Sequence, residues 1–238
     1  MARSRPQRLA ALIIVLSSCL AASAHAEIGA SALIESDYRF RGVSLSDDRP
    51  ALSLNLSYDH PSGVYGAVSG VFVNTRYDGI QVLGYTVLAG YARQLPSGLS
   101  LDVGASNSNV TVFLDGRYST NYTEIYAGLS SDKLSAHIYY SPRYLGEGGG
   151  SVYLDLGGAV HPADHWRLSA HVGALMRLGP RQAVDAGRTQ LDLRLGVARE
   201  FKGCEVRVDW TVASPAPVFP AQYRQEGAKL VVGAAFFF

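Results

Sequence analysis

Apolar and polar residues alternate at a period of two over short stretches of this 238-residue chain. In residues 52–58, three leucines and a tyrosine alternate with serine and asparagine, and residues 166–174, 191–197 and 206–212 follow the same pattern. A period of two places every second side chain on one face of a β-strand, whereas a surface helix repeats every 3.6 residues. The chain is therefore predicted to fold into strands that are apolar on one face only.

Composition narrows the class further. Hydrophobic residues make up 47% of the chain and charged residues 17%, which is too apolar for a disordered protein. After residue 26 the longest apolar run is Leu230–Phe238, well short of the roughly 18–20 residues that a spanning helix needs. The net charge is +1, so no basic domain suggests a nucleic-acid partner. An all-β chain remains, either a soluble sandwich or a membrane barrel.

The N-terminus has the pattern of a secretory signal peptide. Three arginines precede an apolar run at residues 9–20, and a small-residue cleavage site follows at residues 24–26. We expect residues 1–26 to be removed and residues 27–238 to form one domain. An alternative cut before Cys19 would leave a lipidated cysteine, but it would fall within the apolar run.

Turn signals divide the chain into strands of similar length. Short turns are predicted near residues 60–63, 95–98, 130–133, 161–164 and 201–203. Longer polar stretches lie near residues 43–50, 74–79, 107–120, 142–150, 179–188 and 213–227. These connections predict about twelve antiparallel strands, and the spacing of about 18 residues suits tilted strands of 9–11 residues across a bilayer.

Two features favour a closed transmembrane barrel over a sandwich. Short turns on one side and long loops on the other are typical of outer-membrane barrels. Aromatic residues also fall near the predicted strand ends, where interfacial girdles form. The residues assigned to these girdles are Tyr38, Phe40, Tyr58, Tyr122, Tyr126, Tyr140, Trp166 and Trp210.

The C-terminus is a third feature. Apolar residues alternate from Leu230 to Phe236 and Phe238, which resembles the membrane-assembly signal of bacterial outer-membrane proteins. Closure is also required physically, because an open sheet edge in hydrocarbon would leave backbone groups without hydrogen bonds. An even strand number and a signal peptide would place both termini on the periplasmic side.

Several segments carry a family resemblance. They are residues 35–44 (ESDYRFRGVS), 48–52 (DRPAL), 124–130 (EIYAGLS), 139–144 (YYSPRY), 153–155 (YLD) and 168–173 (LSAHVG). Together they resemble the TorF porin family over nearly the whole chain after residue 26, except at residues 107–118. The resemblance implies an outer-membrane β-barrel of Gram-negative bacteria, without a catalytic motif and without a named solute.

The phase of each predicted strand selects the side chains that face the lumen. They are Glu35, Asp37, Arg39 and Arg41 on the first strand, then Asn55, Asp102, Glu124, His137, Asp155, Arg167, His171, Arg177, Asp192, Arg194, Glu205, Arg207, Asp209 and Lys229. Acidic and basic residues are nearly balanced in this set, which argues against strong ion selectivity. In residues 64–75 and 80–93 both faces are apolar or small, so the phase there stays open.

These charges admit two interpretations. In the first, a ladder of arginines faces carboxylates across a water-filled pore; the ladder is Arg39, Arg41, Arg194 and Arg207, opposite Asp37, Asp192 and Asp209. In the second, the same residues form a salt-bridge mesh that fills a narrow lumen. Twelve strands lie between small filled barrels and the wide porins, so size does not decide.

The predicted function is passive diffusion of small hydrophilic solutes, including ions, through an outer-membrane porin. The expected partners are outer-membrane lipid and lipopolysaccharide, the barrel-assembly machinery and the solutes, while a homo-oligomer stays open. A filled structural barrel, a barrel-embedded hydrolase and a soluble or lipid-tethered periplasmic protein are the alternatives.

Other sites carry weaker signals. Ser135, His137 and His171 supply residue types for nucleophilic catalysis without a signature, so barrel wall is the preferred interpretation. His161 and His165 have helical metal-ligand spacing, but Pro162 denies the helix. The glycine-rich residues 146–150 precede a strand rather than a helix, which favours a loop over a phosphate site. No enzyme activity, cofactor or metal is therefore expected.

Overall fold

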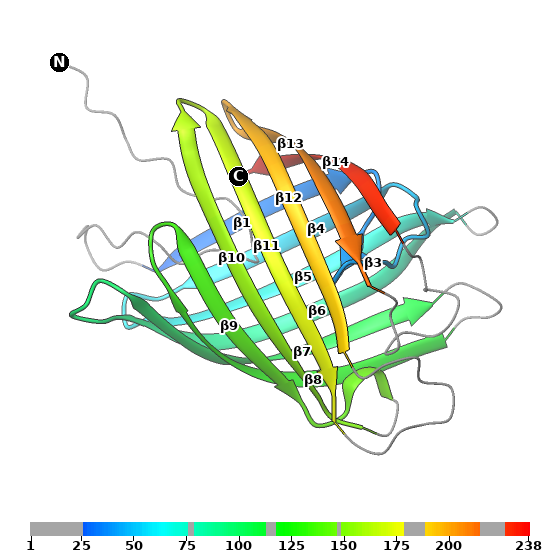
Figure 1. Cartoon of the computed structure of the whole chain (residues 1–238), viewed down its shortest axis with the longest axis horizontal. Coiled ribbons are helices and arrows are strands. Elements are labelled where there is room, and N and C mark those ends of the chain that lie inside the picture. The colour runs from blue at the N-terminus through cyan, green and yellow to red at the C-terminus, as the bar shows by residue number, and fades with distance from the viewer. Residues whose placement is uncertain (1–25, 76–78, 113–117, 147–148, 179–188, 215–226) are drawn as a thin grey trace.

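The computed structural model describes residues 26–75, 79–112, 118–146, 149–178, 189–214 and 227–238 (Figure 1). The strands are β1 (Glu27–Glu35), β2 (Arg39–Phe40), β3 (Val43–Ser44), β4 (Ala51–Asp59), β5 (Val64–Thr75), β6 (Gly79–Gln94), β7 (Ser100–Val112), β8 (Tyr118–Ser130), β9 (Leu134–Ser141), β10 (Ser151–Ala163), β11 (Trp166–Arg177), β12 (Thr189–Phe201), β13 (Cys204–Ala213) and β14 (Gly227–Phe237). One short 3₁₀ turn, η1, spans Tyr144–Gly146. Among these residues, no helix is both long and apolar enough to cross a membrane.

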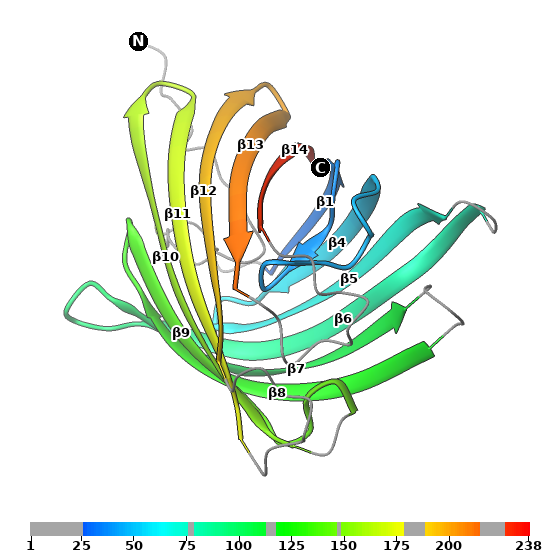
Figure 2. The same ribbon diagram turned by 45° about the vertical axis from the view of Figure 1, so that its right-hand side comes forward.

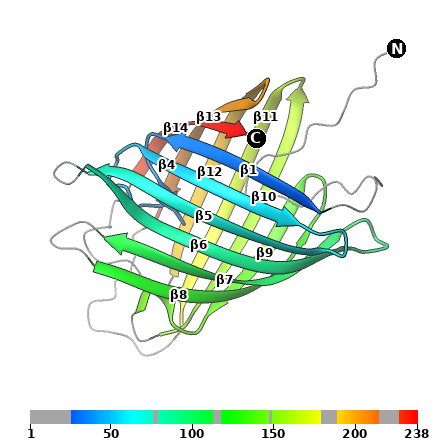
Figure 3. The same ribbon diagram turned by 180° about the vertical axis from the view of Figure 1, so that it is seen from behind.

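Twelve of these strands, β1 and β4–β14, form one closed antiparallel barrel, as predicted (Figures 1 and 3). Each barrel strand pairs with its neighbours in sequence, and β1 closes the ring by pairing with β14. Strands β2 and β3 pair only with each other, as a separate hairpin. The predicted signal peptide and its alternative cut at Cys19 lie outside the described residues.

The two ends of the barrel differ. Tight turns join β4 to β5, β6 to β7, β8 to β9, β10 to β11 and β12 to β13 at one end, which we call the short-turn end. Figure 1 shows the C-terminus on the same side as the turns after β10 and β12. The connections at the other end, which we call the long-loop end, range from three residues between β5 and β6 to fifteen between β1 and β4. The predicted long loop at residues 74–79 is therefore wrong, because β5 continues to Thr75 and β6 begins at Gly79.

The outside of the barrel is apolar. Every barrel strand carries at least one large hydrophobic side chain that is more than a third exposed, at the alternate positions that face away from the lumen. Leu56 on β4, Ile138 on β9 and Leu195 on β12 are 53%, 47% and 46% exposed, for example. The polar residues between them face the lumen. A soluble sandwich would show the opposite arrangement, so the sandwich alternative is wrong.

The predicted loop at residues 107–120 is mostly strand, because β7 and β8 pair as far as Val112 and Tyr118. Outward-facing amides stabilise this extension: Asn107 donates to Thr123 Oγ1 at 2.9 Å, and Asn109 donates to Asn121 Oδ1 at 3.0 Å. These bonds link polar side chains on the outer face, in contrast to the apolar surface nearer the short-turn end. Strands β7 and β8 therefore continue beyond the apolar band.

A β-bulge explains the phase that the sequence leaves open. Val71 pairs with Gly84 and Phe72 pairs with Val82, so Leu83 is an extra residue in β6. The bulge switches the faces of β6: Val82 is 42% exposed, whereas Leu83 is 2% exposed and faces inward. A single alternation therefore cannot describe residues 79–94.

Half of the predicted aromatic girdle lies outside the barrel and half lies inside. Tyr58, Tyr140, Trp166 and Trp210 face outward and are 37–43% exposed. The prediction is wrong for Tyr38, Phe40, Tyr122 and Tyr126, which lie in the lumen. Tyr122 and Tyr126 share the phase of inward-facing Glu124 on β8, and the other two belong to the segment between β1 and β4 that carries the β2–β3 hairpin.

Candidate functional site

The segment between β1 and β4 folds into the lumen. Strand β1 ends at Glu35, and residues 36–50 then turn inward, carrying the β2–β3 hairpin; we call residues 36–50 the plug. At the hairpin tip, Arg41 and Gly42 both have positive φ angles, of 50° and 77°. The prediction that Arg39 and Arg41 continue the first strand is therefore wrong, because the chain reverses between them and Ser44.

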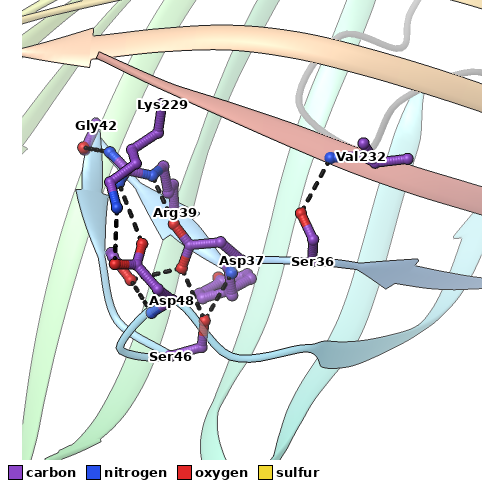
Figure 4. A network of polar contacts seen from close by, with 10 residues as sticks. Ser36, Asp37, Arg39, Gly42, Ser46, Asp48, Lys229 and Val232 are labelled. Carbon is purple, nitrogen blue, oxygen red and sulfur yellow. Dashed lines mark hydrogen bonds and ion pairs between the residues drawn. The ribbon is translucent and has the colours of Figure 1, made fainter. Parts of the chain in front are cut away.

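Asp37 holds the plug in this shape (Figure 4). Its Oδ1 atom accepts hydrogen bonds from the hydroxyls of Ser44 and Ser46, and its Oδ2 atom lies 2.6 Å from Arg39 Nε. The Ser46 hydroxyl also accepts a bond from the Tyr38 amide at 2.8 Å. One buried carboxylate thus connects both arms of the hairpin, and the bonds from charged and hydroxyl donors offset its desolvation.

The tip of the plug reaches the opposite wall. Arg41 Nη2 lies 2.9 and 2.8 Å from the two carboxylate oxygens of Glu124 on β8. The Gln190 side-chain amide on β12 donates to the Arg41 carbonyl at 2.8 Å. At Gly42 a Cβ would lie 2.7 Å from the Cβ atoms of Ala213 and Asp192, so the tip touches β12 and β13 closely enough that only glycine fits.

The plug packs like the core of a soluble domain. Val43 and Leu45, 1% and 5% exposed, belong to one apolar cluster with wall residues that include Leu83, Tyr122 and Leu175. Between the plug and strands β5–β8 there is a cavity of about 30 Å³, room for about one water molecule. The plug therefore fills part of the long-loop half of the lumen.

Aromatic rings surround the Arg41 guanidinium. Its central carbon lies 4.1 Å from the ring centroid of Tyr153, 5.2 Å from Tyr144 and 5.7 Å from Tyr139. These distances are within the range of cation–π attraction. Burial raises the pKa of Tyr144, in η1, to about 12, although the Arg41 charge opposes this shift. The guanidinium is thus enclosed by neutral rings and one carboxylate.

Strand β14 anchors the base of the plug (Figure 4). The Ser36 amide donates to the Val232 carbonyl at 2.8 Å, and the Val232 amide donates to the Ser36 hydroxyl at 3.0 Å. Lys229 Nζ lies 2.9 Å from Asp48 Oδ2. The plug is therefore fixed to the wall on both sides of its hairpin.

The lumen wall nearer the short-turn end carries paired charges. Arg167 on β11 donates to both carboxylate oxygens of Glu205 on β13. Arg207 on β13 bridges Glu35 on β1 at 3.0 Å and Asp209 at 3.2 Å. These side chains cross between strands on the inner face and link β11, β13 and β1.

Two further clusters contain the lumen histidines. His137 Nε2 lies 3.4 Å from Asp102, which also accepts a hydrogen bond from Tyr65. His171 Nε2 lies 2.9 Å from Asp192. The other ring nitrogen of His171 lies 3.4 Å from Asp155. Each histidine thus contacts at least one carboxylate.

These clusters do not assemble a nucleophile. Among the described residues no serine is hydrogen-bonded to either histidine, so the geometry of Ser135, His137 and His171 offers no triad. Within the same part of the chain, no three histidine, cysteine or carboxylate side chains are grouped as a metal site requires. His165 lies in the tight turn between β10 and β11.

The structure places the predicted lumen set on the inner surface or in the plug. Asp37, Arg39 and Arg41 belong to the plug, and Arg194 lies half-buried on β12, close enough for its charge to act on Glu35. The wall carries Glu35, Glu124, Asp155, Arg167, His171, Asp192, Glu205, Arg207 and Asp209. That these residues guide a solute remains a prediction.

The predicted ladder of separated charges is wrong for three of its four arginines. Arg39, Arg41 and Arg207 each contact a carboxylate directly, Asp37, Glu124 and Glu35 respectively, rather than facing one across open water. The reason is that the plug carries two of these arginines into the lumen, where a buried charge needs a partner. The salt-bridge mesh describes this part of the lumen better.

Sequence reasoning missed the residues that surround Arg41. Tyr139 and Tyr153 share the inward phase of His137 and Asp155, so the alternation contained the signal. Gln190 shares the phase of Asp192 in the same way. Tyr144 lies in a connection, where the alternation gives no signal.

Residues 20–229 match a family described as a bacterial protein of unknown function (Gcw_chp). The chain belongs to this family. No curated protein matches the chain. The resemblance of this Gcw_chp protein to the TorF family stays a prediction.

Solved structures resemble the Gcw_chp barrel in fold. The NanC porin superposes with a TM-score of 0.58 at 10% identity, over 88% of this chain and 99% of that one. The KdgM porin gives a TM-score of 0.54 at 14% identity, also over 88% and 99%. At these identities the likeness shows a porin-type barrel fold.

Proposed function

We propose that this Gcw_chp protein is an outer-membrane channel for the passive diffusion of small hydrophilic solutes. The observation that supports this proposal is that the closed barrel wall has apolar side chains on its outer face and polar side chains on its inner face. Large apolar residues are exposed on every barrel strand, while charged and hydroxyl side chains lie inside. An apolar exterior of this extent is unstable in water and stable in hydrocarbon, and a polar interior suits an aqueous path.

The wall near the short-turn end supports an aqueous path. Inward positions there include small residues, such as Ser57, Ala67 and Ser106, that remain partly accessible rather than buried. Tyr65 and Tyr126 are likewise only partly buried. Small side chains with residual exposure leave space in the lumen, whereas a filled barrel would bury them.

The plug favours a second candidate, a structural barrel that never conducts. Val43 and Leu45 pack the plug against the wall in the long-loop half of the lumen, and a plug that blocks this half permanently would leave only a membrane-embedded scaffold. The channel requires that a path exists beside the plug or that the plug moves.

Planar bilayer recordings of the refolded barrel test the proposal. We expect discrete conductance steps, with heat-modifiable migration in gels as the check that the barrel is folded. A folded barrel that stays silent at all voltages, with the plug present and with it removed, would overturn the channel and leave the structural barrel.

The proposed location and the predicted signal peptide are tested by cell fractionation. We expect the protein in the detergent-extracted outer membrane, starting at residue 27. Phe238, 79% exposed at the end of the chain, is proposed with Phe236 as part of the assembly signal. Phe238→Ala is expected to lower the amount of folded barrel in that fraction; unchanged amounts would contradict this role. Whether the barrel forms homo-oligomers can be read from the same extracts.

A further inference from the structure

Most of the pocket that receives Arg41 is built by the barrel wall, and the plug adds one ring, that of Phe40, whose centroid lies 4.9 Å from the guanidinium carbon. Glu124 comes from β8, Tyr139 from β9, Tyr153 from β10, and Tyr144 from the η1 turn that follows β9. The rings of Tyr139 and Tyr153 contact each other, with centroids 6.1 Å apart. Neighbouring strands therefore hold Glu124, Tyr139 and Tyr153 in place independently of the residue that fills the pocket.

The chemistry of this pocket selects a planar cation. Three tyrosine rings present their faces within 5.7 Å of the guanidinium carbon, and the carboxylate of Glu124 accepts hydrogen bonds from one edge of it. Glu124, Tyr144 and Tyr153 are 4%, 2% and 3% exposed, so the attraction acts where water does not compete. Aromatic cages of this kind bind organic cations in many proteins.

The pocket is continuous with the more open part of the lumen. Tyr139 is only partly buried, and its ring lies 5.5 Å from that of Tyr126 and 6.1 Å from that of His137. The hydroxyl of Tyr126 in turn contacts that of Tyr65 on β5. A row of rings thus leads from the lumen near the short-turn end to the pocket.

The occupant itself is held in an uncommon conformation. Arg41 has a φ angle of 50°, in the left-handed region that favours glycine. The strain of this backbone is sustained by the contacts of the guanidinium with Glu124 and the rings. The side chain of Arg41 therefore acts as the group that inserts the plug into the pocket.

We propose that Glu124, Tyr139, Tyr144 and Tyr153 form a binding site for the guanidinium group of a small cationic solute, and that Arg41 occupies this site as a tethered competitor. A solute that takes the place of Arg41 removes the contact that holds the plug tip against β8. The inference deepens the proposed channel function, because it names a solute class and a way in which that solute weakens the closure.

Arg41→Gly is the variant that tests the site, because glycine suits the positive φ angle and leaves the pocket empty. The probe is methylguanidinium chloride, titrated into the refolded barrel in detergent and followed by calorimetry, with sodium chloride at equal ionic strength as reference. Because the probe must displace Arg41, its affinity for the unmodified protein is reduced by the fraction of protein in which the pocket is empty. With that fraction at about a tenth or less, we expect R41G to bind the probe at least about tenfold more tightly than the unmodified protein.

Two controls make the test specific. R41G/E124Q, which removes the carboxylate from the emptied pocket, is expected to lose the gain. Arg167→Ala breaks a different arginine–carboxylate pair, the one with Glu205, for which the described residues show no ring contact, and it is expected to bind no better than the unmodified protein. Equal binding by R41G and the unmodified protein, or by R41G and R41G/E124Q, would overturn the site. If R41G does not fold, Arg41→Asn, whose short neutral side chain tolerates a positive φ angle and leaves the pocket empty, is held to the same ranking.

The measurement does not depend on conduction. A silent barrel whose R41G variant binds methylguanidinium would overturn the channel and keep the site. A conducting barrel whose R41G variant gains no binding would overturn the site and keep the channel.

Discussion

The two halves of the lumen share one wall but differ in how that wall is used. Near the long-loop end, the segment between β1 and β4 folds toward the inside of the barrel (Figure 2). There Val43 and Leu45 pack with wall residues like a protein core, and Arg41 meets Glu124. Near the short-turn end, the same strands carry small and partly accessible residues. Alternation within a strand therefore determines which side chains face the lumen. Whether those side chains are accessible to water depends on the segment that folds inside the barrel.

Removing the plug tests this difference most strongly. Glu35 and Ala51 are paired on β1 and β4, so an Asn-Gly turn in place of residues 36–50 can join them without disturbing the wall. We expect the barrel to remain folded and its single-channel conductance to rise severalfold. Unchanged conductance would mean that the plug does not limit the path.

Glu124→Gln has the next largest expected effect. It leaves the buried Arg41 guanidinium without a charged partner, at a cost of about 3 kcal/mol to plug docking, equivalent to about a hundredfold faster amide exchange. Hydrogen exchange at the Leu45 amide, which donates to Tyr38 within the plug, measures this.

Glu205→Gln is the matched control at the short-turn end. Its partner Arg167 is 13% exposed and can turn toward water, so we expect a loss of about 1 kcal/mol in barrel stability and no change in plug exchange. An equal effect of both substitutions on the Leu45 amide would remove the distinction between the two halves.

A pair of glycines compares the plug tip with an ordinary turn. Gly42 and Gly203 share a φ angle of 77°, but a Cβ at Gly42 would meet two wall residues, and one at Gly203 would meet nothing within 4 Å. Gly203→Ala is expected to cost about 1 kcal/mol from the backbone alone, measured by urea unfolding.

Gly42→Ala adds a steric clash to that strain, so we expect a loss of about 2–3 kcal/mol in plug docking, again read from exchange at the Leu45 amide. Similar small effects of both substitutions would show that the tip does not press against β12 and β13.

The smallest expected effect is a response to alkaline pH. The pKa of Tyr144 lies at about 12 in the folded protein and near 10 when exposed, so the neutral form stabilises the docked plug below pH 10 and this stabilisation is lost toward pH 12. We expect conductance to rise over this window. Tyr144→Phe, which cannot ionise, should weaken the rise; an unchanged rise would assign it to other groups.

The local sequence pattern predicted the strands of the barrel wall but not the plug inside it. Turn signals predicted the number and direction of the strands. The alternation of Leu54, Leu56 and their counterparts predicted the outer face, because successive side chains of a strand point to opposite faces. The plug could not be predicted in this way, since Arg41 meets Glu124 across 83 residues of sequence. The same limit explains Tyr144, which lies in a connection, whereas Tyr139 and Tyr153 followed the alternation and could have been found.

The bonds between the plug and β14 bear on how this barrel assembles. β1 pairs with β4 over nine residue pairs but with β14 over only five, and the contacts of Ser36 with Val232 and of Asp48 with Lys229 continue that short seam. The plug therefore finds its full set of partners only after the first and last strands of the chain have met. Closure of the barrel and docking of the plug are thus coupled steps of folding. A barrel in which β1 and β14 have not paired would also have an undocked plug.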